Sequence, residues 1–433
     1  MHTKTTRRAF AATTLAAGTA VAAIPAVSAA SRVAAPAMLG AQGDKTEINV
    51  YHIWGTPPGG AAPEKPTPMM QVIDAFNEQS TTTTVNSFTP GGYNETLQKV
   101  QADIAAGNAP DIVSVPWAFL NYAVDGLGIR ELESIVGDGM TDLQAMISDS
   151  AWPLVTREET IYGMPWGLST PIMYYNADVF AEAGVDPEVM FDTWESFATE
   201  APKLQGVLGG GPVFAVSYNK DWAAQTIIQS NGGRVLNVDG TFGFASDESK
   251  QAMQTIADLD TAGFYDRGTA DELRPNFEAG STAIIQSSVA SLNGLRNAVP
   301  FTLGTHTWPK FGDKPVVAST GGSFLGIFSD DEARYEAILE FLRFCAGEVG
   351  YPLWNQTGYV NISTLELERL EGQDPAYAQF EAGLERETNW PSARGMEAGT
   401  TWGVYCERMW ANDISVEEGV EEALAEINAI VGN

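Results

Sequence analysis

Histidine and cysteine are scarce in this chain, which holds only 3 His and 2 Cys among 433 residues. His2 lies at the extreme N-terminus, so His52 and His306 alone would have to build a metal centre, and no HExxH motif occurs. Cys345 and Cys406 lie too far apart in sequence for a CxxC site. Both fall in helix-like segments, where a disulfide and two buried free thiols are both open. We therefore expect no metal and no cofactor.

The motifs of nucleotide-binding and serine-nucleophile enzymes are also missing. No GxSxG turn, P-loop or GxGxxG stretch is present. The sequence GGSFLG around Ser323 is only superficially similar to a nucleophile turn, and its glycine pair favours close approach of the backbone to another group. The 55 acidic residues guarantee many carboxylate pairs, so such pairs do not by themselves indicate a glycosidase. A protein without catalysis is favoured, and a secreted carbohydrate-active enzyme is the alternative.

Positive charge is in short supply. The chain carries 24 Lys and Arg against 55 Asp and Glu, which gives a formal net charge of −31. Such a field repels phosphate backbones and anionic membranes, so nucleic acid is not an expected partner. After the N-terminal segment no apolar run reaches the roughly 18 residues that a membrane-spanning helix needs, and we expect no such helix there.

The N-terminal segment 1–29 has the pattern of an export signal. Basic residues Lys4, Arg7 and Arg8 precede a mildly apolar stretch that ends in small residues typical of a cleavage site. The arginine pair followed by Phe10 favours a twin-arginine-type signal, with an ordinary secretion signal as the alternative. No cysteine follows the apolar stretch, so lipid anchoring there is not expected. The pattern predicts a soluble exported protein in the periplasm or at the cell exterior.

The order of strands and helices predicts an α/β protein. Strand-like segments at 46–55, 81–88 and 110–116 alternate with amphipathic helical patterns at 69–76 and 93–104. This β-α-β-α-β rhythm is typical of a largely parallel sheet with helices on its faces. A length of 433 residues exceeds what one core usually holds, so two domains are expected.

The segment GLSTPIMYYNADVFAEAGVDP at 167–187 allows three interpretations. It resembles a catalytic elbow at its start, an ordinary strand-helix unit at its end, and a joint between two lobes as a whole. The elbow is disfavoured because the segment contains no base. A crossing between lobes with its bend at 167–171 and a helix ending at Gly184 is therefore predicted.

Aromatic residues are the positive signal, with 11 Trp, 13 Tyr and 19 Phe. Aromatic faces stack on the C–H faces of sugars and polyols and on cations. For any single residue, packing in the core is the alternative, but two or three of the set are expected to line a cleft. Candidates beside polar residues at strand ends or in loops are Trp54, Trp117, Trp166, Trp222, Tyr359 and Trp402.

Several motifs together resemble one family. They are GNAPDIV (107–113), STPIMYYNADVFAEAGVDP (169–187), NFEAGSTAIIQSS (276–288), STGGSFLGIFS (319–329) and NQTGYVNIS (355–363). They occur in the family's order over nearly the whole chain after the signal. The chain resembles the extracellular solute-binding proteins of bacterial ABC importers in the group for sugars and glycerol derivatives. It is most similar to the glycerol-3-phosphate-binding branch.

The resemblance implies two α/β lobes, each a mostly parallel sheet with flanking helices, joined by hinge segments around a ligand cleft. It places the N-terminal lobe at 44–168 and 308–348, and the C-terminal lobe at 169–307 and 349–433. It also implies an ABC permease as partner, a monomeric state, and a sugar or polyol-like solute as ligand. A glycerol-3-phosphate or glycerophosphodiester ligand is the alternative within this function.

The resemblance further implies ligand-binding positions. One residue departs from the branch: Trp117 stands where the branch has an acid. Another, Glu397, stands where the branch carries an Arg that holds phosphate, which favours a neutral or partly cationic ligand. The alternative for Glu397 is a solvated surface acid, and the nearby Arg394 is displaced by three residues. The full set is Tyr93, Trp117, Ser169, Trp222, Ser288, Gly322, Tyr359 and Glu397.

Overall fold

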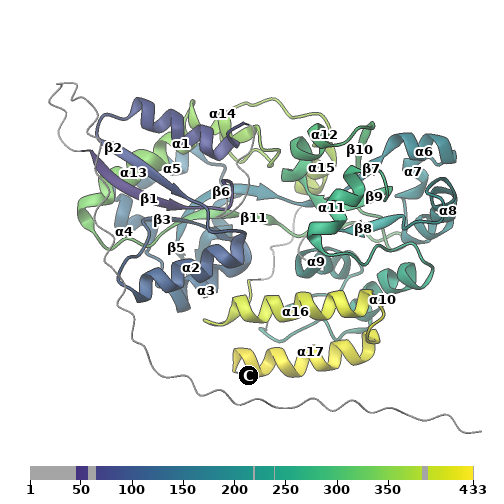
Figure 1. Cartoon of the computed structure of the whole chain (residues 1–433). Coiled ribbons are helices and arrows are strands. Elements are labelled where there is room, and N and C mark those ends of the chain that lie inside the picture. The colour runs from purple at the N-terminus through teal and green to yellow at the C-terminus, as the bar shows by residue number, and fades with distance from the viewer. Residues whose placement is uncertain (1–44, 57–64, 218–219, 238, 383–388, 433) are drawn as a thin grey trace, which may run out of the picture. The chain divides into compact units, whose positions relative to one another are not determined.

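The structure is a computed structural model (Figure 1). It describes residues 45–56, 65–217, 220–237, 239–382 and 389–432. The predicted signal at 1–29 lies outside the described residues. Within the described ranges, no helix has both the length and the apolar character needed to cross a membrane.

A five-stranded sheet forms the centre of the first lobe. Its strands in spatial order are β2 (Thr83–Phe88), β1 (Thr46–Tyr51), β3 (Ile112–Pro116), β11 (Gly321–Ile327) and β6 (Gly163–Ser169). β1 pairs in parallel with β2 and β3, as expected where helices connect successive strands. β11 is antiparallel to β3 and β6. Since β11 is antiparallel to both β3 and β6, β6 runs in the same direction as β1, β2 and β3. The prediction of a mostly parallel sheet thus holds for the direction of four of these five strands, and β11 runs against them.

A four-stranded sheet forms the centre of the second lobe. Its order is β10 (Leu303–His306), β7 (Pro171–Asn176), β9 (Ile284–Ser288) and β8 (Phe214–Val216). Only β8 and β9 pair in parallel, and β7 is antiparallel to both of its neighbours. β8, β9 and β10 therefore run in one direction and β7 runs against them, so the prediction of a mostly parallel sheet holds for strand direction except at β7. β7 enters directly from β6, so the crossing between the lobes sets its direction.

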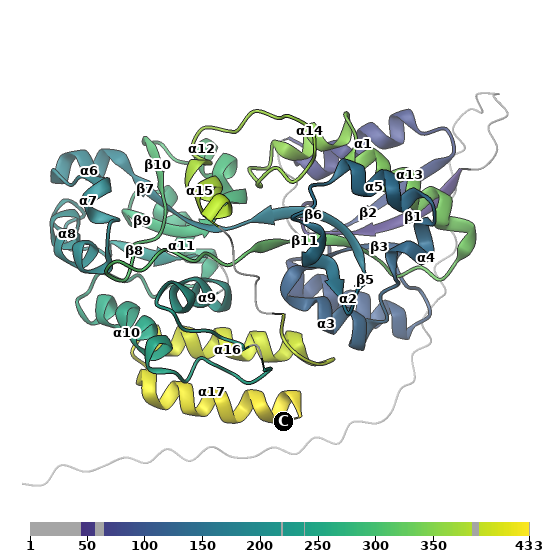
Figure 2. The ribbon, with the colours of Figure 1, turned by 180° about the vertical axis from the view of Figure 1, so that it is seen from behind.

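Helices cover both sheets (Figures 1 and 2). In the first lobe α1, α13 and α14 pack together, and in the second lobe α16 contacts α9, α10 and α17. The helices near the first sheet are α1 (Pro68–Gln79), α2 (Tyr93–Ala105), α3 (Leu120–Tyr122), α4 (Leu132–Val136), α5 (Gly139–Met146), α13 (Tyr335–Ala346) and α14 (Gly350–Asn355). The others are α6 (Ala177–Ala183), α7 (Pro187–Met190), α8 (Trp194–Val207), α9 (Lys220–Ser230), α10 (Asp247–Thr261), α11 (Ala270–Glu278), α12 (Leu292–Ala298), α15 (Asp374–Ala382), α16 (Gly395–Trp410) and α17 (Val416–Val431).

Shorter elements complete the chain. They are the hairpin of β4 (Thr156–Arg157) and β5 (Thr160–Ile161), the π-helical turn η2 (Ala123–Leu127), and the 3₁₀ turns η1 (Trp117–Phe119), η3 (Trp152–Val155), η4 (Val289–Ser291) and η5 (Glu332–Arg334).

The chain passes from the first sheet to the second within the stretch predicted as a bend. Ser169 ends β6 and Pro171 begins β7, which leaves Thr170 between the sheets. Thr170 is buried, and its hydroxyl donates a hydrogen bond to Gln379 Oε1 of α15 at 2.5 Å. The following helix, α6, ends at Gly184 in the left-handed conformation, as predicted.

Two segments pack differently from the predicted lobe boundaries. Residues 308–319 were expected in the N-terminal lobe, but Trp308 Nε1 donates a hydrogen bond to the carbonyl of Pro171 in β7 at 3.0 Å. Helix α14 was expected in the C-terminal lobe, but it packs against α1 and α13. Both contacts favour reassigning these segments, and the boundaries elsewhere stay a prediction.

The two cysteines lie in different helices. Cys345 of α13 and Cys406 of α16 are both buried and both free. Burial raises the pKa of each thiol well above its ordinary value, so neither is a reactive thiolate at neutral pH.

Candidate functional site

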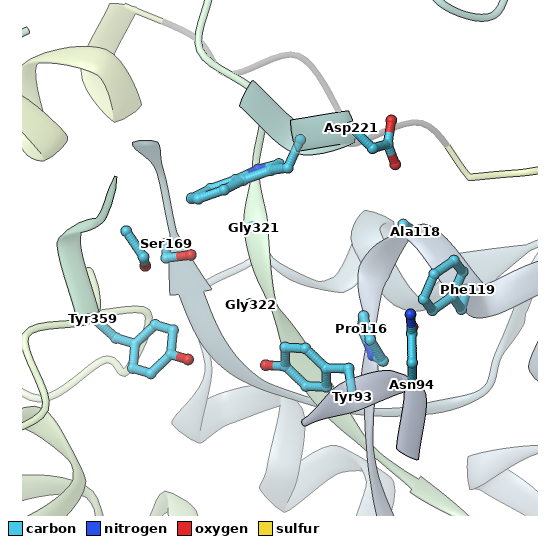
Figure 3. Close-up of a pocket in the computed structure, with 12 residues that line it drawn as sticks. Tyr93, Asn94, Pro116, Ala118, Phe119, Ser169, Asp221, Gly321, Gly322 and Tyr359 are labelled. Carbon is cyan, nitrogen blue, oxygen red and sulfur yellow. The ribbon is translucent and has the colours of Figure 1, made fainter. Parts of the chain in front are cut away.

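A cavity of about 550 Å³ lies where the two sheets meet. Residues of both lobes and of the crossing strands form its wall (Figure 3). We call it the inner cavity. Its lining residues are Tyr93, Asn94, Pro116, Ala118, Phe119, Ser169, Asp221, Trp222, Ser288, Gly321, Gly322 and Tyr359.

The inner cavity brings together six of the eight positions predicted from sequence. They come from α2, from the ends of β6 and β9, from α9 and β11, and from the loop after α14. Their role toward a ligand stays a prediction. The six are Tyr93, Ser169, Trp222, Ser288, Gly322 and Tyr359.

Trp222 forms one aromatic wall and is fixed from behind. Its Nε1 donates a hydrogen bond to the carbonyl of Thr320 at 3.0 Å, and the side chain is only 3% exposed. A Cβ at Gly321 would lie 2.4 Å from Trp222 Cζ2 and 2.8 Å from Ser169 Oγ. A side chain at position 321 would collide with both groups, so glycine there allows the indole of Trp222 and the hydroxyl of Ser169 to line the cavity.

Tyr359 forms the opposite aromatic wall. Its ring stacks on Trp354 at 5.0 Å between centroids, and Trp54 meets it edge-on at 6.3 Å. Burial raises the pKa of the Tyr359 phenol, although hydrogen bonds involving Trp54 and Tyr93 act in the opposite direction. Trp166 stacks behind Trp354 at 4.6 Å, so this aromatic stack supports Tyr359 from the core.

Two other tryptophans considered from the sequence are core residues. Trp166 and Trp402 are fully buried and are not among the lining residues of the inner cavity. Trp402 of α16 stacks on Phe244 at 4.3 Å. The core-packing alternative therefore describes both.

Trp117 lies behind the cavity wall rather than in it. Its Nε1 donates a hydrogen bond to the carbonyl of Gly321 at 2.9 Å. Gly322 has φ 104°, and a Cβ there would lie 2.0 Å from the carbonyl oxygen of Gly167. Trp117 thus holds the start of β11 in place, and the structure does not place it among the lining residues.

Glu397 lies outside the inner cavity. Both of its carboxylate oxygens accept hydrogen bonds from Arg394, at 2.6 and 2.8 Å, and both side chains are about half exposed. Glu397 is therefore a solvated surface acid, which was the alternative considered from the sequence. Arg394 is engaged in the ion pair with Glu397.

Asp221 is a lining residue that sequence reasoning missed. It lies in the first turn of α9, and its side chain is 2% exposed. Oδ1 accepts a hydrogen bond from Gln225 Nε2 at 3.0 Å, and Oδ2 accepts one from Trp390 Nε1 at 3.1 Å. Burial raises the pKa of this carboxyl to about 7, against the effect of those two donors. The available signal was an acid directly before the largely apolar segment WAAQTII.

The partner of Asp221 belongs to a segment that contacts the first lobe. Trp390 N donates to the carbonyl of Ala118 at 3.1 Å, and Asn121 N donates to Asn389 Oδ1 at 3.0 Å. The indole of Trp390 is fully buried and reaches Asp221 on the second lobe. Residues 389–390 therefore connect Asp221 with the start of α3.

A wider cavity adjoins the inner one and shares Tyr93, Asn94 and Phe119 with it. We call it the outer cavity. It has a volume of about 1320 Å³, and the rest of its wall includes Gly399, Thr400, Gly403 and Val404 of α16.

Three charged side chains line the outer cavity: Glu95, Lys220 and Glu407. The ammonium of Lys220 donates a hydrogen bond to the carbonyl of Val216. Burial lowers its pKa to about 8, although Glu407 acts in the opposite direction. Among the described residues, no group of three or more His, Cys, Asp or Glu is placed to hold a metal ion.

Comparison with known proteins adds a family match and relatives. The model of the family described as "Bacterial extracellular solute-binding protein" matches residues 71–378. The sn-glycerol-3-phosphate-binding periplasmic protein UgpB of Pectobacterium atrosepticum is 25% identical over 389 residues, which cover 83% of this chain and 87% of that protein.

Solved structures share the fold. ABC substrate-binding protein Lmo0181 from Listeria monocytogenes, in complex with cycloalternan, has a TM-score of 0.77 at 19% identity and covers 90% of this chain and 100% of that one. UgpB from Mycobacterium tuberculosis, in complex with glycerophosphocholine, has a TM-score of 0.72 at 20% identity, with 83% and 94% covered. At these identities the likeness concerns the two-lobe α/β architecture.

Proposed function

Because the chain belongs to the bacterial extracellular solute-binding protein family, we propose that it captures a sugar or polyol-like solute in the inner cavity for delivery to an ABC permease. The observation that carries the ligand class is the make-up of the wall. Aromatic faces of Trp222 and Tyr359 stand with the hydroxyls of Ser169 and Ser288 around one cavity. Stacking surfaces combined with a few polar groups suit the alternating C–H and O–H surface of a polyhydroxy compound.

The charge of the cavity wall favours an uncharged ligand. Among the described lining residues of the inner cavity, Asp221 is the only one with a charged side chain, and it is acidic. A phosphate beside it would meet like charge in a poorly solvated place. The solute therefore presents hydroxyl groups there. The outer cavity leaves room for a ligand longer than one sugar ring.

Glycerol-3-phosphate or a glycerophosphodiester is the second candidate. The printed function of the Pectobacterium atrosepticum relative favours it, as does the glycerophosphocholine held by the Mycobacterium tuberculosis protein. Among the described residues that line the two cavities, Lys220 is the basic one that could hold a phosphate. Its hydrogen bond to Val216 and its position in the outer cavity make it a weaker argument than the acid in the inner one.

The residues of the inner cavity suit binding of a solute without its hydrolysis. A glycosidase needs two carboxyl groups about 5 to 10 Å apart, flanking the scissile bond. Asp221 is the only carboxylate among the described residues that line the inner cavity. The proposal includes a monomer that is exported, with a twin-arginine-type signal, and closes around its ligand. Closure is driven only by the ligand's higher affinity for the closed form.

A thermal-shift screen of the protein without residues 1–29 tests this function. The probes are maltose, ribitol, glycerophosphocholine and glycerol-3-phosphate. We expect an uncharged saccharide or polyol to raise the melting temperature and to be recovered unchanged. Stabilisation by glycerol-3-phosphate alone would support the second candidate. Conversion of a stabilising glycoside into products would instead establish an enzyme.

A further inference from the structure

Helix α15 is bonded to two of the segments that pass between the lobes. The first is the turn at Thr170, between β6 and β7, and α15 also contacts β7 (Figure 2). The second is the chain that joins α14 of the first lobe to α15. The two segments meet each other, because Val360 N donates a hydrogen bond to the carbonyl of Leu168 at 2.8 Å.

Gln379 of α15 fixes the first segment at Thr170. The hydroxyl of Thr170 donates a hydrogen bond to Gln379 Oε1 at 2.5 Å. Thr170 is fully buried and Gln379 is 4% exposed, so little water competes for this bond. The carbonyl of Thr170 accepts a second hydrogen bond, from Val289 N at 3.1 Å. The peptide next to Ser169 is therefore held from two sides.

Gln373, the residue directly before α15, fixes the second segment. Its side chain is 1% exposed, and Nε2 donates to the carbonyls of Gly358 at 2.8 Å and Tyr359 at 3.1 Å. Oε1 accepts a hydrogen bond from Leu370 N at 2.6 Å. Gly358 has φ 101°, and a Cβ there would lie 2.8 Å from the carbonyl oxygen of Val289. The backbone at 358–359 is therefore held between Gln373 and η4.

The residues anchored in this way are sequence neighbours of three residues that line the inner cavity, namely Ser169, Ser288 and Tyr359. A side chain is placed no more precisely than its own backbone, so anchoring the neighbouring peptides fixes where the two hydroxyls and the ring stand. Tyr174 adds to this, because its hydroxyl donates to the carbonyl of Ser288 at 2.8 Å. Groups held in place before a ligand arrives bind it more tightly, since less ordering is needed.

The alternative is that the two glutamines serve stability alone. A buried carboxamide costs free energy unless its polar groups are bonded, so apolar side chains suit plain packing better. Ala376 and Tyr377 are the buried packing residues of α15. The two buried carboxamides, in contrast, are bonded to the two segments that carry Ser169 and Tyr359. Their placement favours a role in binding as well as in stability.

Resting on the proposed function, in which the inner cavity holds the ligand, we propose that Gln373 and Gln379 are positioning residues for ligand binding. Gln379 acts through Thr170 on the hydroxyl of Ser169. Gln373 acts through the backbone at 358–359 on the ring of Tyr359. Neither glutamine is among the residues that line the inner cavity. The spacing between a hydroxyl and an aromatic face of the site is thus set by one short segment behind them.

A double-mutant cycle tests the role of Gln379. The proteins are the wild type, Thr170→Val, Ser169→Ala and the variant with both changes. Thr170→Val removes the hydroxyl that reaches Gln379 and keeps a branched side chain. The probe is whichever of maltose, ribitol, glycerophosphocholine and glycerol-3-phosphate raises the melting temperature of the wild type most, so the test is independent of the ligand class. Titration calorimetry measures the dissociation constants, and circular dichroism verifies folding.

Thr170→Val should weaken binding of the probe about tenfold when Ser169 is present. In the Ser169→Ala background the same change should weaken binding less than about twofold, because the group through which Thr170 acts is already absent. Thr170→Ser keeps the hydroxyl and should bind within about threefold of wild type. Thr199→Val is the matched control, since it removes an exposed hydroxyl bonded to the carbonyl of Glu195 in α8, and it should bind within about twofold of wild type.

A second cycle with Gln373→Met and Tyr359→Leu tests the other glutamine. Gln373→Met keeps an unbranched side chain of similar length and removes the donor to the backbone at 358–359. It should weaken binding about tenfold alone and less than about twofold when Tyr359→Leu is present.

Additive losses in a cycle would overturn the role of the glutamine concerned and leave the proposed function intact, because the change would then act on the whole cavity. Wild-type affinity in Thr170→Val and in Gln373→Met would overturn both roles. If Thr170→Val does not fold, Thr170→Val combined with Gln379→Leu replaces it, since removal of both partners leaves no buried group unpaired. Its loss of affinity should likewise depend on Ser169. Wild-type affinity in both Ser169→Ala and Tyr359→Leu would overturn the proposed binding site together with this inference.

Discussion

Two acids in the first turns of two helices of the second lobe have opposite surroundings. Asp221 of α9 is buried in the wall of the inner cavity and is held by two neutral donors. Glu397 of α16 is half exposed and is paired with Arg394. A buried charge acts on its neighbours through little solvent, whereas an exposed ion pair is screened by water and salt. The comparison teaches that burial, and not the presence of an acid in a motif, decides how strongly a carboxylate acts on its neighbours.

The acids behind the net charge of −31 have surroundings like those of Glu397 rather than those of Asp221. Most of these acids are exposed, and salt screens their field beyond about one Debye length, roughly 8 Å at physiological ionic strength. They bear on solubility and on the exclusion of polyanionic partners. Among the described residues that line the inner cavity, the charged side chain is that of Asp221.

Trp222→Ala should have the largest effect on the inner cavity. Loss of a buried aromatic wall should weaken binding of the uncharged ligand on the order of 100-fold. It should also lower the free energy of unfolding by about 3 to 5 kcal/mol, because Trp222 is 3% exposed and packs against Gly321. Calorimetric titration and urea unfolding measure the two effects. Trp222→Phe is the control, with intermediate values. Wild-type affinity in Trp222→Ala would remove the indole from the site.

The pH dependence of stability should reveal the buried acid Asp221. The folded pKa of Asp221 is about 7, raised from 3.8 by burial, so the folded state keeps a proton that the unfolded state has lost. The wild type is therefore most stable, with respect to this group, below about pH 4, and it loses stability as pH rises to about 7. The loss is on the order of 4 kcal/mol.

Asp221→Asn should lack this contribution. Unfolding of wild type and variant in urea at pH 5 and pH 8, without ligand, measures the difference. The stability of the variant relative to wild type should rise between the two pH values. Parallel pH profiles of wild type and Asp221→Asn would mean that Asp221 is ionised at low pH and is better solvated than its burial implies.

Glu397→Gln should have the smallest effect. Its pair with Arg394 is half exposed, so its removal should change stability by about 0.5 kcal/mol or less. The affinity for glycerol-3-phosphate should change less than about twofold, measured by the same calorimetric titration. A several-fold gain in affinity for glycerol-3-phosphate would restore the sequence interpretation, in which Glu397 repels phosphate.

The sequence predicted much of the fold and half of the residues that line the inner cavity. Its motifs placed the crossing at 167–171, where Ser169 ends one sheet and Pro171 begins the other. They also identified six positions of one cavity, because short motifs such as GGS and TGYVN carry their own local geometry. The directions of β7 and β11 could not be predicted from the sequence, because each of these strands follows a crossing between the lobes.

The remaining site residues depend on tertiary packing. Trp117 looked like a cleft residue, but its indole reaches the carbonyl of Gly321, which is distant in sequence. Asp221 belongs to no matched motif, and its buried position depends on Trp390, also distant in sequence. Glu397 was assigned by a short alignment, and its pairing with Arg394 follows only from the turn of α16.

Proton exchange on binding tests the central claim most directly. The described titratable groups that bear on Asp221 or line the same cavities are Lys220 of α9, Cys406 and Glu407 of α16, Tyr93 and Glu95 of α2, and Tyr359. The pKa of Lys220 is about 8, and burial raises the pKa of Cys406 and Tyr359 above their ordinary values, whereas that of Asp221 is about 7. Hydroxyl donors stabilise the ionised carboxylate and lower its pKa, so an uncharged ligand should displace a proton.

Calorimetric titrations at pH 7 in buffers of different ionisation enthalpy measure this exchange. We expect the wild type to release about half a proton per bound saccharide or polyol, because Asp221 is about half ionised at that pH. Asp221→Asn should exchange close to none. Proton uptake by the wild type on binding would contradict the account, because it would mean that the ligand brings negative charge to Asp221.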